Sequence, residues 1–234
     1  SMGFPDILAV MAQRIYNGTT GFTLLAIPFF ILAGNLMNAT GITRRLIKFS
    51  TILTGHLRGG LAHVSCVLST LMGGISGSAC ADAAMEARIL GPDMIKRGYS
   101  KGFSASVIAL TSLITATIPP GVGLILYGVT GGVSIGKLFV AGIVPGIIMM
   151  GFLMFASGRI ARKRQYPVEN ERPPKAGEVW AGLKESIWAL IFPIILIVGI
   201  RFGLFTASEA GAFAVVYAFI IGKFVSKELT WKKL

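Results

Sequence analysis

Charged residues are scarce in this chain, and acidic residues are the scarcest. Asp, Glu, Lys and Arg together make up 14% of the 234 residues, whereas a soluble globular domain carries about 25%. So little charge argues against an ordinary soluble enzyme and against a disordered tail. An apolar fraction of 53% and a mean hydropathy of +0.73 instead favour a helical membrane protein with several spans.

Cysteine and histidine are also rare, with two of each. Two cysteines exclude a disulfide-rich scaffold, and Cys66 and Cys80 lie in an apolar, glycine-rich stretch that favours small buried packing residues. The chain has no paired-carboxylate cluster, no HExxH helix, no Gly-x-Ser-x-Gly turn and no metal-spaced set of Cys and His. We therefore expect no enzyme activity and no cofactor.

The net charge of +12 has a pattern typical of membrane topology. Basic residues gather in short clusters between uncharged runs, as they do in cytoplasmic loops, and not on one folded surface that binds nucleic acid. We expect a lipid bilayer as partner and no nucleic acid. The clusters, all predicted to be cytoplasmic, are Arg44–Arg45–Lys48–Arg58, Lys96–Arg97–Lys101, Arg159–Arg162–Lys163–Arg164 and Lys223–Lys227–Lys232–Lys233.

Residues 59–94 are predicted to form a re-entrant helical hairpin. They lie between two basic clusters on the same side, so a single crossing does not fit. The arms, of about 15 and about 12 residues, are each too short to span a bilayer. The tip is Ser76-Gly77-Ser78, and its backbone must line a cavity or be buried in protein. The alternative is one plain span that packs through its glycines.

Residues 98–130 are predicted to form a broken helix. Pro119 and Pro120 each lack an N–H and disfavour helix in the residue before them, and Gly121 and Gly123 add freedom. The alternative is a simple kink. The other predicted elements are spans at 22–40, 138–158, 183–200 and 206–223, an interfacial arm at 44–58, a linker at 159–180 and a basic cytoplasmic end of the 181–234 region.

A re-entrant hairpin together with a broken helix is typical of secondary transporters. Unwound carbonyls and hydroxyls can replace the hydration shell of a cation, and a helix N-terminus can attract an anionic substrate. The hydroxyls close to the two breaks belong to Ser76, Ser78, Thr115 and Thr117. Asp82 follows the hairpin tip and has two readings: an intramembrane carboxylate with a functional role, or an exposed charge at a helix start.

The order of several motifs resembles the large membrane subunit of TRAP (tripartite ATP-independent periplasmic) transporters. The similarity runs from about Ile7 to Leu234. Its motifs are LAIPFFILAGNLM at 25–37, GHLRGGLA at 55–62, SGS at 76–78, IPP at 118–120, YG at 127–128, SIGKLF at 134–139, AGIVPG at 141–146 and TASEA at 206–210.

This resemblance implies an all-α, polytopic subunit of the bacterial inner membrane that is one half of an inverted-repeat, elevator-type transporter. The family takes up organic acids such as dicarboxylates or sialic acid with sodium as the coupling ion. Its partners are a periplasmic binding protein and a small membrane subunit. Since the family's large subunit is nearly twice as long, we expect a fragment that covers the first repeat, with Ser1-Met2-Gly3 as an expression scar.

Carried over by motif, the resemblance implies sites at the two breaks. The predicted cation-binding residues are Ser76, Gly77, Ser78, Thr115, Ile118, Pro119 and Gly121. The predicted substrate-binding residues are Ser78, Ala79, Asp82, Pro120 and Gly121. Two alternatives stay open: another proton- or sodium-coupled inverted-repeat carboxylate carrier, and a non-transporting membrane scaffold or channel subunit.

Overall fold

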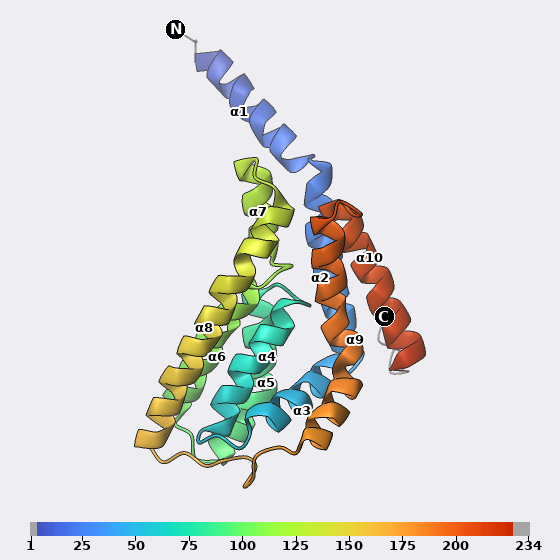
Figure 1. Ribbon diagram of the computed structural model, residues 1–234. Helices are drawn as coiled ribbons and strands as arrows, with labels where there is room; N and C mark the ends of the chain where they lie inside the picture. Colours follow the sequence, from blue (N-terminus) through green and yellow to red (C-terminus); the bar gives the residue numbers. More distant parts are fainter. Residues whose placement is uncertain (1–3, 227–234) are drawn as a thin grey trace.

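The computed structural model describes residues 4–226, and within this range it contains helices and no strand (Figure 1). The predicted basic end at Lys227, Lys232 and Lys233 lies outside the described residues. The elements are α1 (Phe4–Thr19), η1 (Phe22–Leu25), α2 (Ala26–Ala39), α3 (Ile42–Thr54), α4 (Gly60–Gly73), α5 (Ala79–Lys96), α6 (Lys101–Thr117), α7 (Val122–Gly131), α8 (Ile135–Lys163), α9 (Ala176–Arg201), α10 (Ala207–Ile220) and η2 (Ile221–Val225).

Four stretches of the described chain are long and apolar enough to cross a membrane. They are Phe22–Ala39, α8, α9 and Ala207–Val225, and α6 with α7 adds a fifth if the bent pair counts as one span. Large apolar side chains on these helices are exposed, for example Phe152 and Phe155 on α8. Apolar surface of this kind suits contact with lipid, so the chain is an α-helical membrane protein.

Helices α4 and α5 form a helical hairpin whose two open ends lie at the same end of the molecule. Both ends contact the connection between α8 and α9: the Gly59 N–H donates to the Pro167 carbonyl at 3.0 Å, and Arg97 forms a 2.7 Å ion pair with Glu169. Burial raises the pKa of the Glu169 carboxyl, although the positive charge of Arg97 acts in the opposite direction. That this hairpin enters and leaves the bilayer on one side stays a prediction.

The second arm of the hairpin is longer than predicted. Helix α5 has 18 residues and continues through Pro92 to Lys96, because one proline removes only a single intrahelical N–H donor. The helix stops where Gly98 adopts a φ of +87° and the Tyr99 N–H donates to the Met94 carbonyl at 3.0 Å. This left-handed glycine is a common stop signal.

The linker predicted at 159–180 is too wide. Helix α8 continues to Lys163 and α9 already begins at Ala176, because basic residues in the last turn stabilise a helix C-terminus and do not end it. The remaining connection, 164–175, folds back on the turn between α3 and α4. There the N–H groups of Glu169 and Asn170 donate to the Gly55 carbonyl at 2.8 and 3.0 Å.

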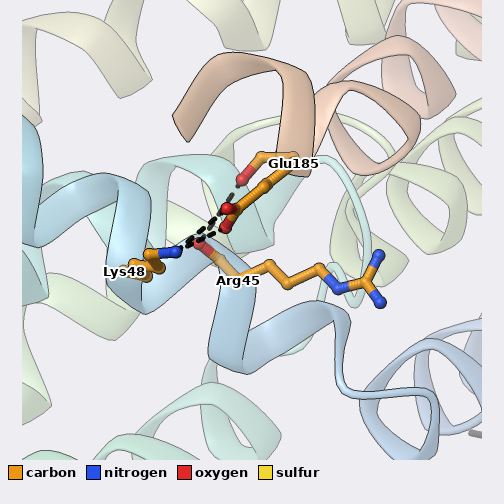
Figure 2. Close-up of polar contacts among 4 residues, drawn as sticks. Arg45, Lys48 and Glu185 are labelled. Carbon is orange, nitrogen blue, oxygen red and sulfur yellow. Dashed lines mark hydrogen bonds and ion pairs between the residues drawn. The ribbon is translucent and has the colours of Figure 1, made fainter. Parts of the chain in front are cut away.

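Helix α3 crosses the base of the molecule and packs on α9 (Figure 1). Figure 2 shows the ion pair of this contact, in which Lys48 Nζ lies 2.8 Å from Glu185 Oε2. Beside it the Ser186 hydroxyl donates to the Arg45 carbonyl at 3.3 Å. Both side chains of the ion pair are about half exposed. Such pairs contribute little, so the buried apolar side of α3 carries most of this contact.

Close packing between helices predicts a clear difference between two glycines of α8. A Cβ on Gly142 would lie 2.5 Å from the Thr117 carbonyl oxygen at the end of α6, whereas a Cβ on Gly151 meets nothing within 4 Å. We expect Gly142→Ala to lower thermal stability by about 1–3 kcal/mol and Gly151→Ala to leave it unchanged or slightly higher. Thermal unfolding of both variants in detergent tests this, and equal melting temperatures would contradict the packing described.

Candidate ion and substrate site

The hairpin tip is a tight turn between the end of α4 and the start of α5. The N–H groups of Ile75 and Ser76 both donate to the Met72 carbonyl at 2.9 Å. Gly77 then adopts a φ of +57°, which L-residues rarely do. Ser78 is the N-cap of α5, and its hydroxyl accepts the Ala81 N–H at 3.4 Å. The tip is thus a glycine turn followed by a serine-capped helix start.

The break between α6 and α7 lies against this tip. The two helices are bent by 47° across residues 118–121, where the Pro119–Pro120 peptide is cis. The Val122 N–H, at the start of α7, donates to the Gly77 carbonyl at 3.3 Å. A Cβ on Gly77 would lie only 2.0 Å from the Pro120 carbonyl oxygen, so only glycine permits this approach. The structure therefore brings the two predicted breaks together.

Four helix ends meet at this tip–break junction, which comprises residues 73–79 and 117–122. The N-termini of α5 and α7 lie here, as do the C-termini of α4 and α6. The two C-termini are in close contact, because a Cβ on Gly73 would lie 2.7 Å from Ile118 Cβ. N-termini favour anions and C-termini favour cations, so the junction offers both kinds of field side by side.

Most of the predicted site residues lie at the junction itself, and they differ in exposure. Ser76, Gly77, Pro119, Pro120 and Gly121 are buried, whereas Ser78, Ala79 and Ile118 are half-buried. The Ser76 hydroxyl lies 3.5 Å from the Met72 carbonyl in the last turn of α4. Thr117 bonds back to the Leu113 carbonyl at 2.9 Å. What these residues bind stays a prediction.

Thr115 and Asp82 belong to a different environment. The Thr115 hydroxyl lies 2.6 Å from Asp82 Oδ2 and 2.8 Å from the Ser69 carbonyl, in the interface of α4, α5 and α6. Asp82 is 1% exposed, so its interpretation as an exposed helix-start charge is wrong. Its Oδ1 atom is buried and has no hydrogen-bond partner among the residues that the structure describes.

Glu86 is a second buried carboxyl in the same interface, and the sequence interpretation missed it. It is fully buried and accepts hydrogen bonds from Ser65 and, at 2.8 Å, from Ser69. Thr111 lies 2.8 Å from the Ser65 hydroxyl. We call Ser65, Ser69, Asp82, Glu86, Thr111 and Thr115 the acidic cluster. The statement that no paired carboxylates occur was therefore wrong.

A sequence signal for the acidic cluster did exist. Its six members form three pairs, each spaced by four residues on one helix, and that spacing places both members on one helix face. Polar pairs of this kind on otherwise apolar helices indicate a polar interface.

The prediction that both cysteines are small buried packing residues was half right, since Cys66 is buried and Cys80 is exposed.

The fold and the junction define a class of protein, a polytopic helical membrane protein with a hairpin and a broken helix that meet. The family is shown by comparison with known proteins. Residues 2–234 match the family of the DctM component of tripartite ATP-independent periplasmic transporters. The chain belongs to this family of TRAP transporter large permeases, as the motifs predicted.

Curated relatives carry different substrate names. The 2,3-diketo-L-gulonate TRAP transporter large permease YiaN of Escherichia coli is 41% identical, over 96% of this chain and 52% of its own length. The sialic acid TRAP transporter permease SiaT of Haemophilus influenzae is 40% identical, over 98% and 37%. The C4-dicarboxylate permease DctM of Rhodobacter capsulatus is 37% identical, over 94% and 53%. The chain spans about half the length of the relatives it matches, or less.

The tip–break contact predicts a strong effect of one methyl group. Gly77→Ala introduces both a left-handed alanine and a collision with Pro120, whereas Gly98→Ala introduces only the left-handed alanine, since a Cβ there meets nothing within 4 Å. We expect a loss of about 1 kcal/mol for Gly98→Ala and of roughly 2–4 kcal/mol for Gly77→Ala. Thermal unfolding measures both. Equal losses would show that backbone strain alone acts at Gly77.

Proposed function

We propose that this chain carries one half of the ion and substrate pathway of a sodium-coupled transporter that imports small organic acids. The observation that supports this is the convergence of four helix ends at the tip–break junction. Discontinuous helices of secondary transporters bind ions and substrates in this way. A scaffold that only packs subunits together has no such need for two paired breaks.

Sodium is proposed to bind at the C-terminal ends of α4 and α6. Carbonyl groups left without intrahelical partners, and the hydroxyls of Ser76 and Ser78, are hard oxygen ligands that suit a small cation. The negative ends of two helix dipoles point to the same place. Among the described residues no group of three His, Cys, Asp or Glu fits a transition metal.

The substrate is proposed to bind at the N-termini of α5 and α7, through Ser78, Ala79, Pro120 and Gly121. The substrates in the relatives' names are all carboxylates, which helix N-termini attract. We place the chain in the bacterial inner membrane and propose two partners, a small membrane subunit and a periplasmic binding protein that delivers the substrate; the family description, a tripartite periplasmic transporter, supports both. Asp82, which the motif carry-over assigned to the substrate, is better placed in the acidic cluster.

Sodium binding at the tip predicts an ion-specific stabilisation that depends on Ser78. At constant ionic strength, replacing choline by sodium should raise the melting temperature of the permease. The corresponding gain in the free energy of unfolding is about 2.7 kcal/mol when the sodium concentration is 100 times the Kd. We expect Ser78→Ala to abolish this shift. The measurement is thermal unfolding of the permease expressed from its native gene.

Ser100→Ala is the control, because Ser100 caps α6 as Ser78 caps α5. The Ser100 hydroxyl also accepts hydrogen bonds from Arg164 and Tyr166, so the control is compared by its sodium shift and not by its melting temperature alone. Both variants lose about 1 kcal/mol of capping, but only Ser78 lies at the junction, so Ser100→Ala should keep the sodium shift. If choline and sodium act alike on the wild type, sodium coupling is wrong. If Ser78→Ala keeps the shift, the ion binds elsewhere.

Proton coupling is a second candidate, and the acidic cluster favours it. Asp82 and Glu86 lie one helical turn apart, buried, with hydroxyl groups as hydrogen-bond donors and no ion pair among the described residues. Two buried carboxylates without a cation are expensive in a membrane. A proton held by the pair would remove one of the charges.

Glu86→Gln separates the two candidates. In liposomes that also contain the small subunit, with the binding protein added outside, we expect sodium-driven uptake of a labelled C4-dicarboxylate or sialic acid to survive this substitution. Asp93→Asn on the exposed face of the same helix is the control. Uptake driven by a pH gradient alone, lost in Glu86→Gln and kept in Asp93→Asn, would establish proton coupling instead.

A further inference from the structure

A basic cavity lies at the C-terminal end of α8, away from the tip–break junction. It has a volume of about 290 Å³ and is enclosed by α8, the start of α4 and the turn that precedes α4. Three arginines line it: Arg58 from the turn, and Arg159 and Arg162 from α8. The positive-inside rule places this end of α8 at the cytoplasmic surface of the membrane.

The three guanidinium groups lack protein anions. Within the described part of the chain, none of them has a carboxylate oxygen within 4.0 Å, while Lys48, Arg97 and Arg172 all form ion pairs. Three unpaired positive charges around one cavity repel each other. An anion in the cavity would remove that repulsion, and guanidinium forks match the geometry of phosphate oxygens.

His63 supplies a buried polar group on the wall of the same cavity. It is 5% exposed, and its Nδ1 atom has no hydrogen-bond partner among residues 4–226. Gly158 lies against the ring, since a Cβ there would approach the imidazole to 3.2 Å. His63 thus adds an imidazole ring to a cavity wall that otherwise consists of arginines and apolar residues.

A shallow, open apolar groove on the surface of α8 adjoins the cavity. This groove, of about 460 Å³, is lined by Ile148, Gly151, Phe152 and Phe155, all of α8, and Phe155 also lines the basic cavity. Phe152 and Phe155 are 71% and 66% exposed. On one helix face, the groove leads from the basic end toward the middle of the span. A ligand that fits both parts has an anionic head and an apolar tail.

We propose that the basic cavity binds the phosphate headgroup of an anionic phospholipid of the cytoplasmic leaflet, with an acyl chain in the Ile148–Phe155 groove. Basic pockets at this level of a membrane bind such headgroups. The bound lipid would contact both α8 and the turn before α4, and would so hold the open end of the hairpin against α8. The site does not depend on which ion the junction binds.

The test is lipid binding to the permease expressed from its native gene, measured by native mass spectrometry in a titration with phosphatidylglycerol. We expect phosphatidylglycerol to bind and phosphatidylcholine not to compete. In the double variant Arg159→Gln/Arg162→Gln the Kd should rise roughly 30-fold, for two arginines at an anionic headgroup. Gly151→Leu, which fills the groove where a Cβ meets nothing within 4 Å, should also weaken binding.

The matched control is Lys163→Gln/Lys96→Gln. It removes the same charge from the last turns of α8 and α5 but leaves the cavity lining intact, so phosphatidylglycerol should bind as in the wild type. If both double variants lose the same affinity for phosphatidylglycerol, the effect comes from net charge alone and the proposal is overturned. If soluble glycerol phosphate binds as tightly as the lipid and Gly151→Leu has no effect, the cavity takes a free phosphate and the lipid assignment is wrong.

Discussion

Backbone polar groups inside an apolar segment need partners, and this constraint governs the whole structure. The hairpin tip and the α6–α7 break each expose N–H and carbonyl groups that lipid cannot satisfy. The two irregular segments answer this need together, with the Val122 N–H on the Gly77 carbonyl and the Gly77 Cα against Pro120. The two breaks therefore form one structural feature, because each provides hydrogen-bond partners and protein contacts for the backbone of the other.

Two polar environments follow from that arrangement, and they differ chemically. The tip–break junction is built from main-chain groups and helix ends, which are the groups that bind ions and carboxylates reversibly in secondary transporters. The acidic cluster behind it is built from side chains, with Asp82 and Glu86 held by serine and threonine hydroxyls. Thr115 lies three residues before the break and belongs to the cluster.

The basic end of the molecule ties distant parts of the chain together. The connection 164–175 bonds to the turn between α3 and α4 and pairs with the end of α5. The hairpin is thus anchored at both of its open ends while its tip reaches the break. The basic cavity lies in the same region, so the proposed lipid would act on the anchored end and the proposed ion and substrate on the tip.

Hydropathy, charge gaps and proline are local properties, so the sequence alone sufficed to predict the membrane class, the family, a pair of short helices at 59–94 and the position of the α6–α7 break. It also located the tip at residues 76–78. Local properties did not reveal that Asp82 is buried, that Glu86 joins it, or that Thr115 faces the hairpin, since burial depends on which helix faces meet. The predicted linker at 159–180 was too long because the basic residues after Gly158 were taken to end the helix, whereas α8 continues to Lys163. The tertiary structure decided which polar groups are neighbours, because packing between helices far apart in the chain sets those distances.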